Sequence, residues 1–243
     1  MDKGLMKIIN KLKSTEGKHH VTSSMIYKNY VRQVNTVAKF SPNAKKILDI
    51  GCGNGYPTAI LYNKFKKSDI IGIDIDKRDA WQTINEAYPI QFQTYNGKDI
   101  PFKNKTFDVV VLFGVLEHIN ENKQDNKIET ELLKEILRVL KPHGYLFIFN
   151  LPNEKSIKEK LCKMLGLWHH KKRFTRERIN SLLKNSKYKI KDIRLYGILP
   201  AGGGPAGPLI PFLNLFAWFI DLEEELPEFS FAESFDVIAQ KNS

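Results

Sequence analysis

Ile47-Leu-Asp-Ile-Gly-Cys-Gly-Asn-Gly55 is the most informative stretch of this 243-residue chain. It begins inside a short apolar run, which is typical of a buried strand. Three glycines follow at alternate positions, so the backbone can turn sharply and approach a ligand with no Cβ in the way. A helix expected after Gly55 presents unbonded N–H groups at its start. The stretch therefore predicts a strand, a ligand-binding turn and a helix in direct succession.

The spacing of these glycines separates two kinds of ligand. A dinucleotide site places its third glycine one residue later, in the GxGxxG pattern, and lays a pyrophosphate on the helix. Here the pattern is GxGxG, and Asp49 precedes it. A carboxylate at this point suits a ligand with a positively charged amino group. Asp74 ends the next apolar run, where a carboxylate can accept hydrogen bonds from both hydroxyls of a ribose.

Apolar runs and helical stripes alternate along the rest of the chain, which predicts βαβ units with right-handed crossovers and a parallel sheet. The segment Lys141-Pro-His-Gly144 is expected to stop one helix before the next strand. Strands are expected at 46–50, 70–74, 90–95, 107–113, 145–149, 189–196 and 235–240. Helices are expected at 21–40, 56–65, 77–87, 128–140, 154–165 and 175–184.

Five motifs in order, ILDIGCGNG, IIGID, NGKDIPF, FDVVVLFGVLEHI and LLKEILRVLKPHGYLFIF, resemble the class I S-adenosylmethionine-dependent methyltransferases. Their style is closest to the ubiquinone-biosynthesis-type small-molecule O-methyltransferases. The resemblance covers residues 45–150 closely and the last two strands loosely. It implies an α/β fold with a Rossmann-like, doubly wound sheet of seven strands in the order 3-2-1-4-5-7-6, the last strand antiparallel, and helices on both faces. It also implies S-adenosyl-L-methionine as the co-substrate.

The resemblance further implies which residues hold this co-substrate. The glycines of the turn would cradle its methionine and ribose, with Asp49 near the amino group and Asp74 on the ribose hydroxyls. Ile75 would pack on the adenine. Asn96 stands where the family commonly has aspartate, and its amide oxygen would accept from the adenine amino group. The full set is Asp49, Gly51, Gly53, Gly55, Asp74, Ile75, Asn96, Gly97 and Phe113.

Leu116-Glu-His118, after the fourth expected strand, is the best place for a catalytic base. The alternative is that His118 is structural and hydrogen-bonded behind the cofactor. Some related enzymes bind a divalent metal here through an acid three residues before the glutamate. That position is Gly114, so no metal is expected. The histidine pairs at 19–20 and 169–170 lack the spacing of a zinc site and are expected on the surface.

The charge and hydrophobicity of the residues outside the core bear on which kind of acceptor the chain would methylate. The formal net charge is +11, and residues 155–191 hold thirteen lysines and arginines against two glutamates. Residues 195–220 hold no charge. A basic stretch beside an apolar one favours an anionic membrane or an acidic, lipid-linked substrate, with peripheral membrane contact through 195–220. A solvated, solubilising helix face is an equal alternative. No secretory segment or long apolar span is present, which favours the cytoplasm.

The length fits a single methyltransferase domain over residues 1–243. It divides into an N-terminal helical cap (1–40), a cofactor-binding core (45–150) and an acceptor-side half (151–243) with an insertion at 197–233. The favoured function is O-methylation of a small-molecule or lipid-linked acceptor. The alternatives are an RNA methyltransferase and a non-catalytic subunit that binds S-adenosylmethionine. A nucleic-acid acceptor is disfavoured because Phe113-Gly-Val-Leu116 replaces the Asn/Asp-Pro-Pro-aromatic box of amino-directed DNA and RNA methyltransferases.

Overall fold

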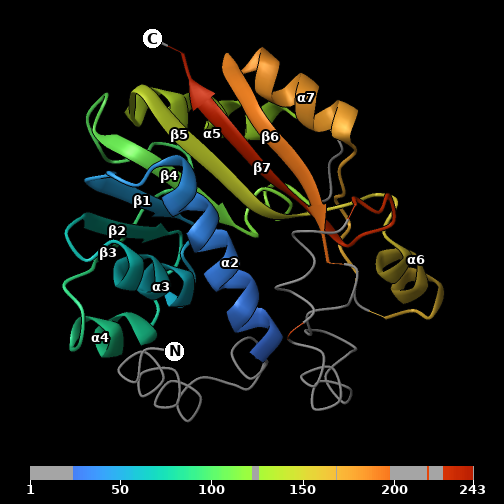
Figure 1. Ribbon diagram of the computed structural model, residues 1–243, viewed down its shortest axis with the longest axis horizontal. Helices are drawn as coiled ribbons and strands as arrows, with labels where there is room; N and C mark the ends of the chain where they lie inside the picture. The colour runs from blue at the N-terminus through green and yellow to red at the C-terminus, as the bar shows by residue number, and fades with distance from the viewer. Residues whose placement is uncertain (1–23, 122–125, 168, 198–217, 219–226, 243) are drawn as a thin grey trace.

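The computed structural model of the chain describes residues 24–121, 126–167, 169–197, 218 and 227–242 (Figure 1). Seven strands of this part form one sheet in the order β3-β2-β1-β4-β5-β7-β6. β7 runs antiparallel to β5 and β6, and the other neighbouring pairs are parallel. The expected fold is confirmed. The strands are β1 (Lys46–Ile50), β2 (Asp69–Asp74), β3 (Gln91–Thr94), β4 (Phe107–Phe113), β5 (Leu140–Pro152), β6 (Tyr188–Tyr196) and β7 (Ser234–Lys241).

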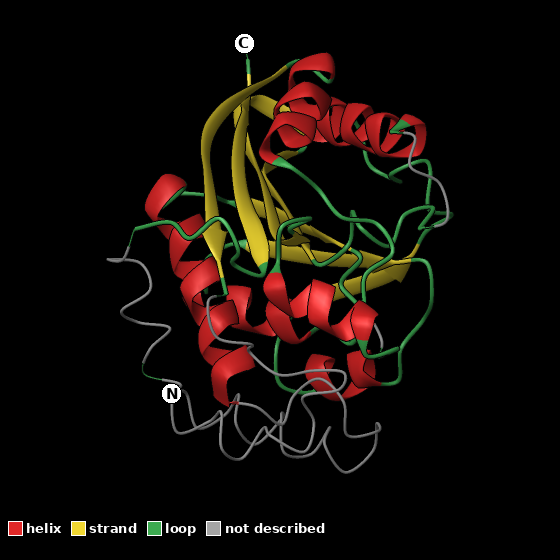
Figure 2. Cartoon of the chain, turned by 90° about the vertical axis from the view of Figure 1, so that its right-hand side faces the viewer, coloured by secondary structure: helices red, strands yellow, loops and turns green. Residues whose placement is uncertain are grey.

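Helices cover both faces of the sheet (Figure 2). They are α2 (Ser24–Phe40), α3 (Tyr56–Lys64), α4 (Ala80–Asn85), α5 (Lys127–Val139), α6 (Ile157–Met164) and α7 (Arg176–Asn185). Side chains of a strand alternate between the two faces. In β4, Val109 and Val111 pack with α2, α3 and α4, whereas Val110 and Leu112 pack with α5 and α7. This double burial explains why β4 is a continuous apolar run.

The segment between α5 and the middle of β5 differs from the expected turn. α5 ends at Val139, but the strand already begins at Leu140, which pairs with Phe107. The register then shifts before Val109 pairs with Tyr145. His143 takes up the irregularity with a φ of 62°. The residues expected to end the helix therefore also form the irregular start of β5.

Two helices in the second half begin at capping side chains. The Ser156 hydroxyl accepts from the backbone N–H of Glu159 at the start of α6. The Thr175 hydroxyl accepts from the N–H of Arg178 at the start of α7. Such caps satisfy donors that have no partner inside the helix. They explain why α6 starts three residues later than the helix expected at 154–165.

The expected insertion 197–233 leaves the sheet after β6 and returns at β7. The backbone N–H of Glu233 donates to the carbonyl of Gly197 across 3.0 Å, so its two ends meet. Asn153 Nδ2 donates to the carbonyls of Ser230 and Ala232 and ties this junction to the end of β5. Most of the expected cap at 195–220 lies outside the described residues. None of the described helices has the length and apolar character needed to cross a bilayer.

Candidate functional site

The glycine-rich turn lies at the carboxyl end of β1. The backbone N–H groups of Gly51 and Cys52 donate to the carbonyl of Ile73 at the end of β2. Gly53 has a φ of 50°, and a Cβ built on it would meet no heavy atom within 4 Å. The backbone at Gly53 thus faces open space, as a ligand cradle requires.

Asp74, at the carboxyl end of β2, fixes this turn. Its Oδ2 accepts from the N–H of Gly53 at 2.8 Å, and its Oδ1 accepts from the N–H of Asp76 at 3.2 Å. On the other side, Trp81 Nε1 donates to the carbonyl of Gly53 at 2.7 Å. The peptide groups on both sides of Gly53 are therefore held in place. Asp74 has a structural task here beside the expected one of binding ribose.

Asp49 is fully buried just before the turn. Its Oδ2 accepts from the Thr58 hydroxyl at 2.6 Å, whereas its Oδ1 has no hydrogen-bond partner among the described residues. Burial raises the pKa of Asp49 to about 7; the Thr58 hydrogen bond lowers it and the charge of Asp74 raises it. A buried carboxylate oxygen without a donor is costly. An amino group bound beside it would remove that cost, so the site fits the amino group of S-adenosylmethionine.

The expected adenine side shows two different arrangements. Ile75 is 62% exposed at the end of β2, as an apolar platform for a ring would be. Asn96, by contrast, uses its amide oxygen within its own loop, where it accepts from the N–H groups of Lys98 and Asp99. A Cβ on Gly97 would lie 3.3 Å from Ile75 Cγ2, so this glycine leaves room beside the platform. The contact between the Asn96 oxygen and adenine stays a prediction.

Phe113, expected to line the pocket, ends β4 inside the core. Its ring stacks on Phe149 with centroids 5.2 Å apart and meets Tyr30 of α2 edge-on at 5.8 Å. Burial raises the pKa of Tyr30 to about 12, with smaller contributions from the charges of Asp49 and Glu117. The Phe113 ring therefore packs the sheet against α2 near the cofactor side, and its contact with a ligand stays a prediction.

Glu117 and His118 follow β4 at the same edge of the sheet. Glu117 is 3% exposed, and burial raises its pKa, while the neighbouring His118 lowers it. His118 is 47% exposed, its Nδ1 pairs with Glu121, and its Nε2 lies 3.8 Å from Glu117 Oε1. His118 thus stands at the surface of the site, where an acceptor could reach it.

His170, expected on the surface, is half-buried. Its side chain is 19% exposed, and its Nδ1 lies 2.9 Å from Glu159 Oε1. Its backbone N–H also donates to Glu159 Oε2. The ring lies 5.9 Å from that of His118, centroid to centroid. No local pattern connects these residues, because their contact depends on how α6 and the following segment fold back on β4.

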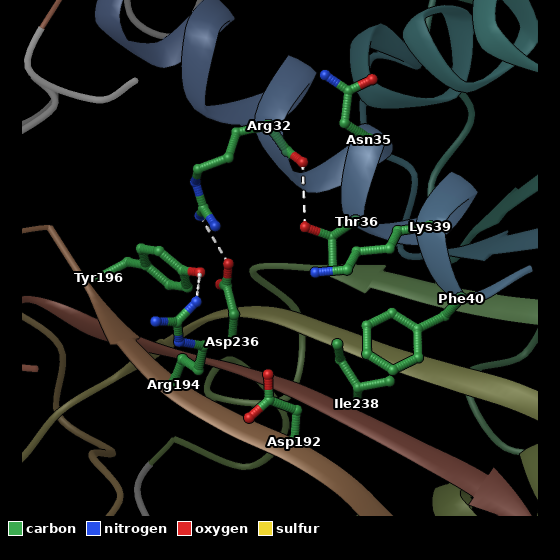
Figure 3. Close-up of a pocket in the computed structure, with 10 residues that line it drawn as sticks. All are labelled: Arg32, Asn35, Thr36, Lys39, Phe40, Asp192, Arg194, Tyr196, Asp236 and Ile238. Carbon is green, nitrogen blue, oxygen red and sulfur yellow. Dashed lines mark hydrogen bonds and ion pairs between the residues drawn. The ribbon is translucent and has the colours of Figure 1, made fainter. Parts of the chain in front are cut away.

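A separate hollow lies between α2 and the β6–β7 strands (Figure 3). It has a volume of about 150 Å³, and none of the expected site residues line it. Arg32 and Asp236 form a buried ion pair of 2.6 Å at its wall. The guanidinium of Arg32 also lies over the ring of Tyr196, 3.7 Å from its centroid. The residues that line this hollow come from α2 and the sheet, and the hollow is separate from the glycine-rich turn.

Comparison with known proteins agrees with this geometry. Residues 48–148 match the family model of a methyltransferase domain. Over these residues the chain is similar to the class I S-adenosylmethionine-dependent methyltransferases. An uncharacterized protein of Methanocaldococcus jannaschii is 33% identical over 175 residues, which are 68% of this chain and 63% of that protein. A probable S-adenosylmethionine-dependent methyltransferase of Mycolicibacterium smegmatis is 26% identical over 61% of this chain and 53% of that protein.

The chain thus spans less than two thirds of each of these two relatives. Among solved structures, a methyltransferase of Methanosarcina mazei is similar, with a TM-score of 0.60 and 20% identity. The match covers 85% of this chain and 97% of that one. At this sequence identity the similarity supports the fold alone. The strand order of this chain is the one typical of class I methyltransferases. The cofactor of the class is S-adenosylmethionine.

Proposed function

We propose that the protein transfers the methyl group of S-adenosylmethionine to an acceptor bound beyond the carboxyl end of β4. The observation that carries this proposal is the buried Oδ1 of Asp49, which has no donor among the described residues and lies directly before the glycine turn. Asp74 and Glu117 add two more buried carboxylates at the same edge. A site with this charge favours a ligand that bears an ammonium and a sulfonium group over a diphosphate.

The side chains of the site would act by binding and orienting the reactants. Bound S-adenosylmethionine would supply a methyl group activated by the sulfonium charge. Asp49 would hold the amino group, and Asp74 the ribose. His118 would handle the proton of the acceptor, so that the acceptor oxygen forms a bond to the methyl carbon as the sulfur–methyl bond breaks. The products are then the methyl ether or ester, S-adenosylhomocysteine and one proton.

For the acceptor, we propose a small molecule of lipid character and O-methylation. The outer face of α6 supports this: its apolar residues have helical spacing and point to solvent, with Met164 75% exposed. They are Ile157, Leu161 and Met164, with Leu165 directly after the helix. Exposed lysines flank them at 155, 160 and 163. An apolar face bordered by lysines suits an anionic lipid surface.

Part of the positive charge of the basic stretch 155–191 is neutralised by ion pairs. Lys158 pairs with Glu233, and Arg176 pairs with Glu228, both from the acidic end of the insertion. Lys172 pairs with the buried Glu129 of α5. These pairs lower the net positive charge of the stretch, and three of its exposed lysines, Lys155, Lys160 and Lys163, lie in or beside α6.

The names of two relatives agree with a lipid acceptor. A fatty-acid O-methyltransferase of Mycolicibacterium smegmatis is 26% identical over 46% of this chain and 39% of that protein. The tocopherol O-methyltransferase of Arabidopsis thaliana is 30% identical over 51% of this chain and 38% of that protein. We also propose that residues 151–243 form the acceptor-side half of one domain, with 195–220 and α6 facing a cytoplasmic membrane surface.

The test is a methyl-transfer assay with the full chain. Purified protein and tritiated-methyl S-adenosylmethionine are mixed with a cell extract, which is then divided into organic-solvent, aqueous small-molecule and RNA fractions. Label in the organic fraction is expected, and Asp49→Asn should abolish it, while Asp69→Asn, at the exposed far end of β2, should not. Label in RNA would overturn the lipid acceptor. Binding of S-adenosylhomocysteine with no label in any fraction would identify a non-catalytic subunit instead.

A further inference from the structure

Three side chains near the carboxyl end of β4 lie close enough together to bind one metal ion. One ligand atom each from Glu117, His118 and His170 lie within 4.8 Å of one another. Glu117 and His118 directly follow β4, whereas His170 comes from the segment between α6 and α7. The cluster therefore joins the cofactor-binding core to the acceptor-side half.

Each imidazole of the cluster is held at Nδ1 by a carboxylate. His118 Nδ1 pairs with Glu121, and His170 Nδ1 lies 2.9 Å from Glu159 Oε1. A carboxylate at one ring nitrogen fixes the ring and its tautomer and makes the other nitrogen the better ligand. Metal-bound histidines in proteins commonly have such a partner. Both histidines thus carry the outer support of a metal site.

The third member, Glu117, supplies an independent observation. It is 3% exposed, and its Oε2 has no hydrogen-bond donor among the described residues. A buried carboxylate in this state carries a desolvation cost that a nearby cation would offset. Its other oxygen already lies 3.8 Å from His118 Nε2. The buried carboxylate and the two anchored rings therefore both support a cation site at this cluster.

We propose that Glu117, with Nε2 of His118 and of His170, binds a divalent transition metal, for which Zn²⁺ is the best fit. Two histidines and one glutamate are the ligand set of several catalytic zinc sites, which keep a fourth position open. Bonds of about 2.0–2.1 Å place neighbouring donors roughly 3.4 Å apart. Glu117 Oε1 and His118 Nε2 lie 3.8 Å apart, and all three ligand atoms lie within 4.8 Å of one another, so side-chain rotations would bring them to this spacing.

This inference departs from the expectation that no metal binds. That expectation rested on Gly114, which lacks the acid found three residues before the glutamate in some related enzymes. Here the additional ligand is His170, which comes from elsewhere in the chain. If the proposed function holds, the open metal position lies on the acceptor side, and a hydroxyl bound there would lose its proton more readily. In that case His118 would act by holding the metal, and the proton of the hydroxyl would pass to solvent.

The experiment measures metal binding directly on the full chain. Protein is stripped with a chelator and dialysed, then titrated with Zn²⁺ by calorimetry and with Co²⁺ by visible absorption, which reports the coordination geometry. About one equivalent is expected to bind, as for a single three-ligand site. Glu117→Gln and His170→Ala should each weaken binding by roughly 100-fold or more, since even outer-sphere losses cost 10–100-fold. His169→Ala, the neighbouring histidine, is the matched control and should bind like the wild type.

Two outcomes would overturn the proposal: no Zn²⁺ bound by the wild-type chain, or equal binding by wild type, Glu117→Gln and His170→Ala. Circular dichroism and thermal melting check that each variant is folded, and His170→Asn provides a more conservative second variant. S-adenosylhomocysteine affinity is measured on the same samples. Normal affinity without metal binding would reject the metal site and leave the methyltransferase proposal intact. Metal binding without S-adenosylhomocysteine binding would do the reverse.

Discussion

The backbone N–H of Gly53 donates a hydrogen bond to Oδ2 of Asp74 across 2.8 Å. The end of β2 therefore holds the turn that follows β1, and the carboxylate that shapes this turn is the one predicted to bind the ribose. Removal of Asp74 would disturb the empty site as well as its contacts with ribose. Loss of cofactor affinity and loss of order in the turn should appear together.

Asp74→Ala is expected to weaken S-adenosylhomocysteine binding by about 1–3 kcal/mol, the range for leaving buried partners unpaired. Calorimetry on the folded variant measures this. Asp69→Ala, at the exposed start of the same strand, should leave the affinity unchanged. NAD binding by the wild type, with no response to S-adenosylhomocysteine, would contradict the assignment of the site.

Asp49 should make both stability and cofactor binding depend on pH. Burial raises its pKa from the ordinary 3.8 to about 7, so between these values the folded chain holds a proton that the unfolded chain has released. The stability of the empty protein should therefore fall as pH rises through this interval. Binding should strengthen over the same interval, by up to about tenfold per pH unit, because an amino group favours the ionised carboxylate.

The measurement is calorimetry of S-adenosylhomocysteine between pH 5.5 and 8, with urea unfolding alongside. Asp49→Asn should flatten both profiles. Among its titratable neighbours, Tyr30 has a pKa raised by burial to about 12, and burial also raises the pKa of the Cys52 thiol, so neither titrates in this range. An unchanged slope in Asp49→Asn would assign the effect to another group.

His118→Ala should lower turnover by roughly 10²- to 10⁴-fold, while cofactor affinity stays nearly constant. The reason is its position at the exposed side of the site, where we propose that it meets the acceptor. Steady-state kinetics and S-adenosylhomocysteine calorimetry on one preparation separate the two effects. A parallel loss of affinity would show that the side chain is structural.

Breaking the ion pair between Arg32 and Asp236 should strongly destabilise the protein. Both side chains are nearly fully buried, and Asp236 also accepts hydrogen bonds from Gln33 Nε2 and the N–H of Asn150. Asp236→Ala leaves the guanidinium buried without its carboxylate, at an expected cost of about 3–5 kcal/mol. Urea unfolding measures this. The double variant Arg32→Met, Asp236→Leu should recover most of the loss, and failure to do so would mean that the wider network matters more than the charge pair.

Replacing residues 212–220 by a short polar linker is expected to abolish acceptor methylation. The sequence predicts an apolar face here that covers the acceptor, while the ends of the insertion are fixed elsewhere. S-adenosylhomocysteine affinity should remain within a few fold of the wild type, because the glycine turn and its supports are untouched. Full activity after replacement, or an unfolded protein, would show that the segment is not a cap.

Features set by neighbouring residues could be predicted from the sequence. β4 was predicted as a strand because its sequence is a continuous apolar run. The turn from Gly51 to Gly55 was predicted as a ligand site because its glycine pattern lies within a few consecutive residues. The hydrogen bonds of the Asn96 amide oxygen are equally local, since asparagine commonly accepts from N–H groups two or three residues ahead. The prediction assigned its oxygen to adenine instead.

Features that depend on distant segments could not be predicted. Lys141-Pro-His-Gly144 has the composition of a turn, and only pairing with Phe107 makes Leu140 the start of a strand. The contact of His170 with Glu159 and its approach to Glu117 depend on the path of the chain around α6. Such meetings follow from tertiary packing, for which a single sequence contains no periodic signal.

The hydrogen bond between Glu233 and Gly197 has an evolutionary consequence. Because the two ends of the insertion are clamped together, β6 and β7 remain paired whatever length of chain connects them. Closure entropy changes slowly with loop length, by only about 0.6 kcal/mol for each doubling. A lineage could therefore exchange residues 198–226 for another segment and serve a different acceptor, while the predicted methyl-donor site is inherited unchanged.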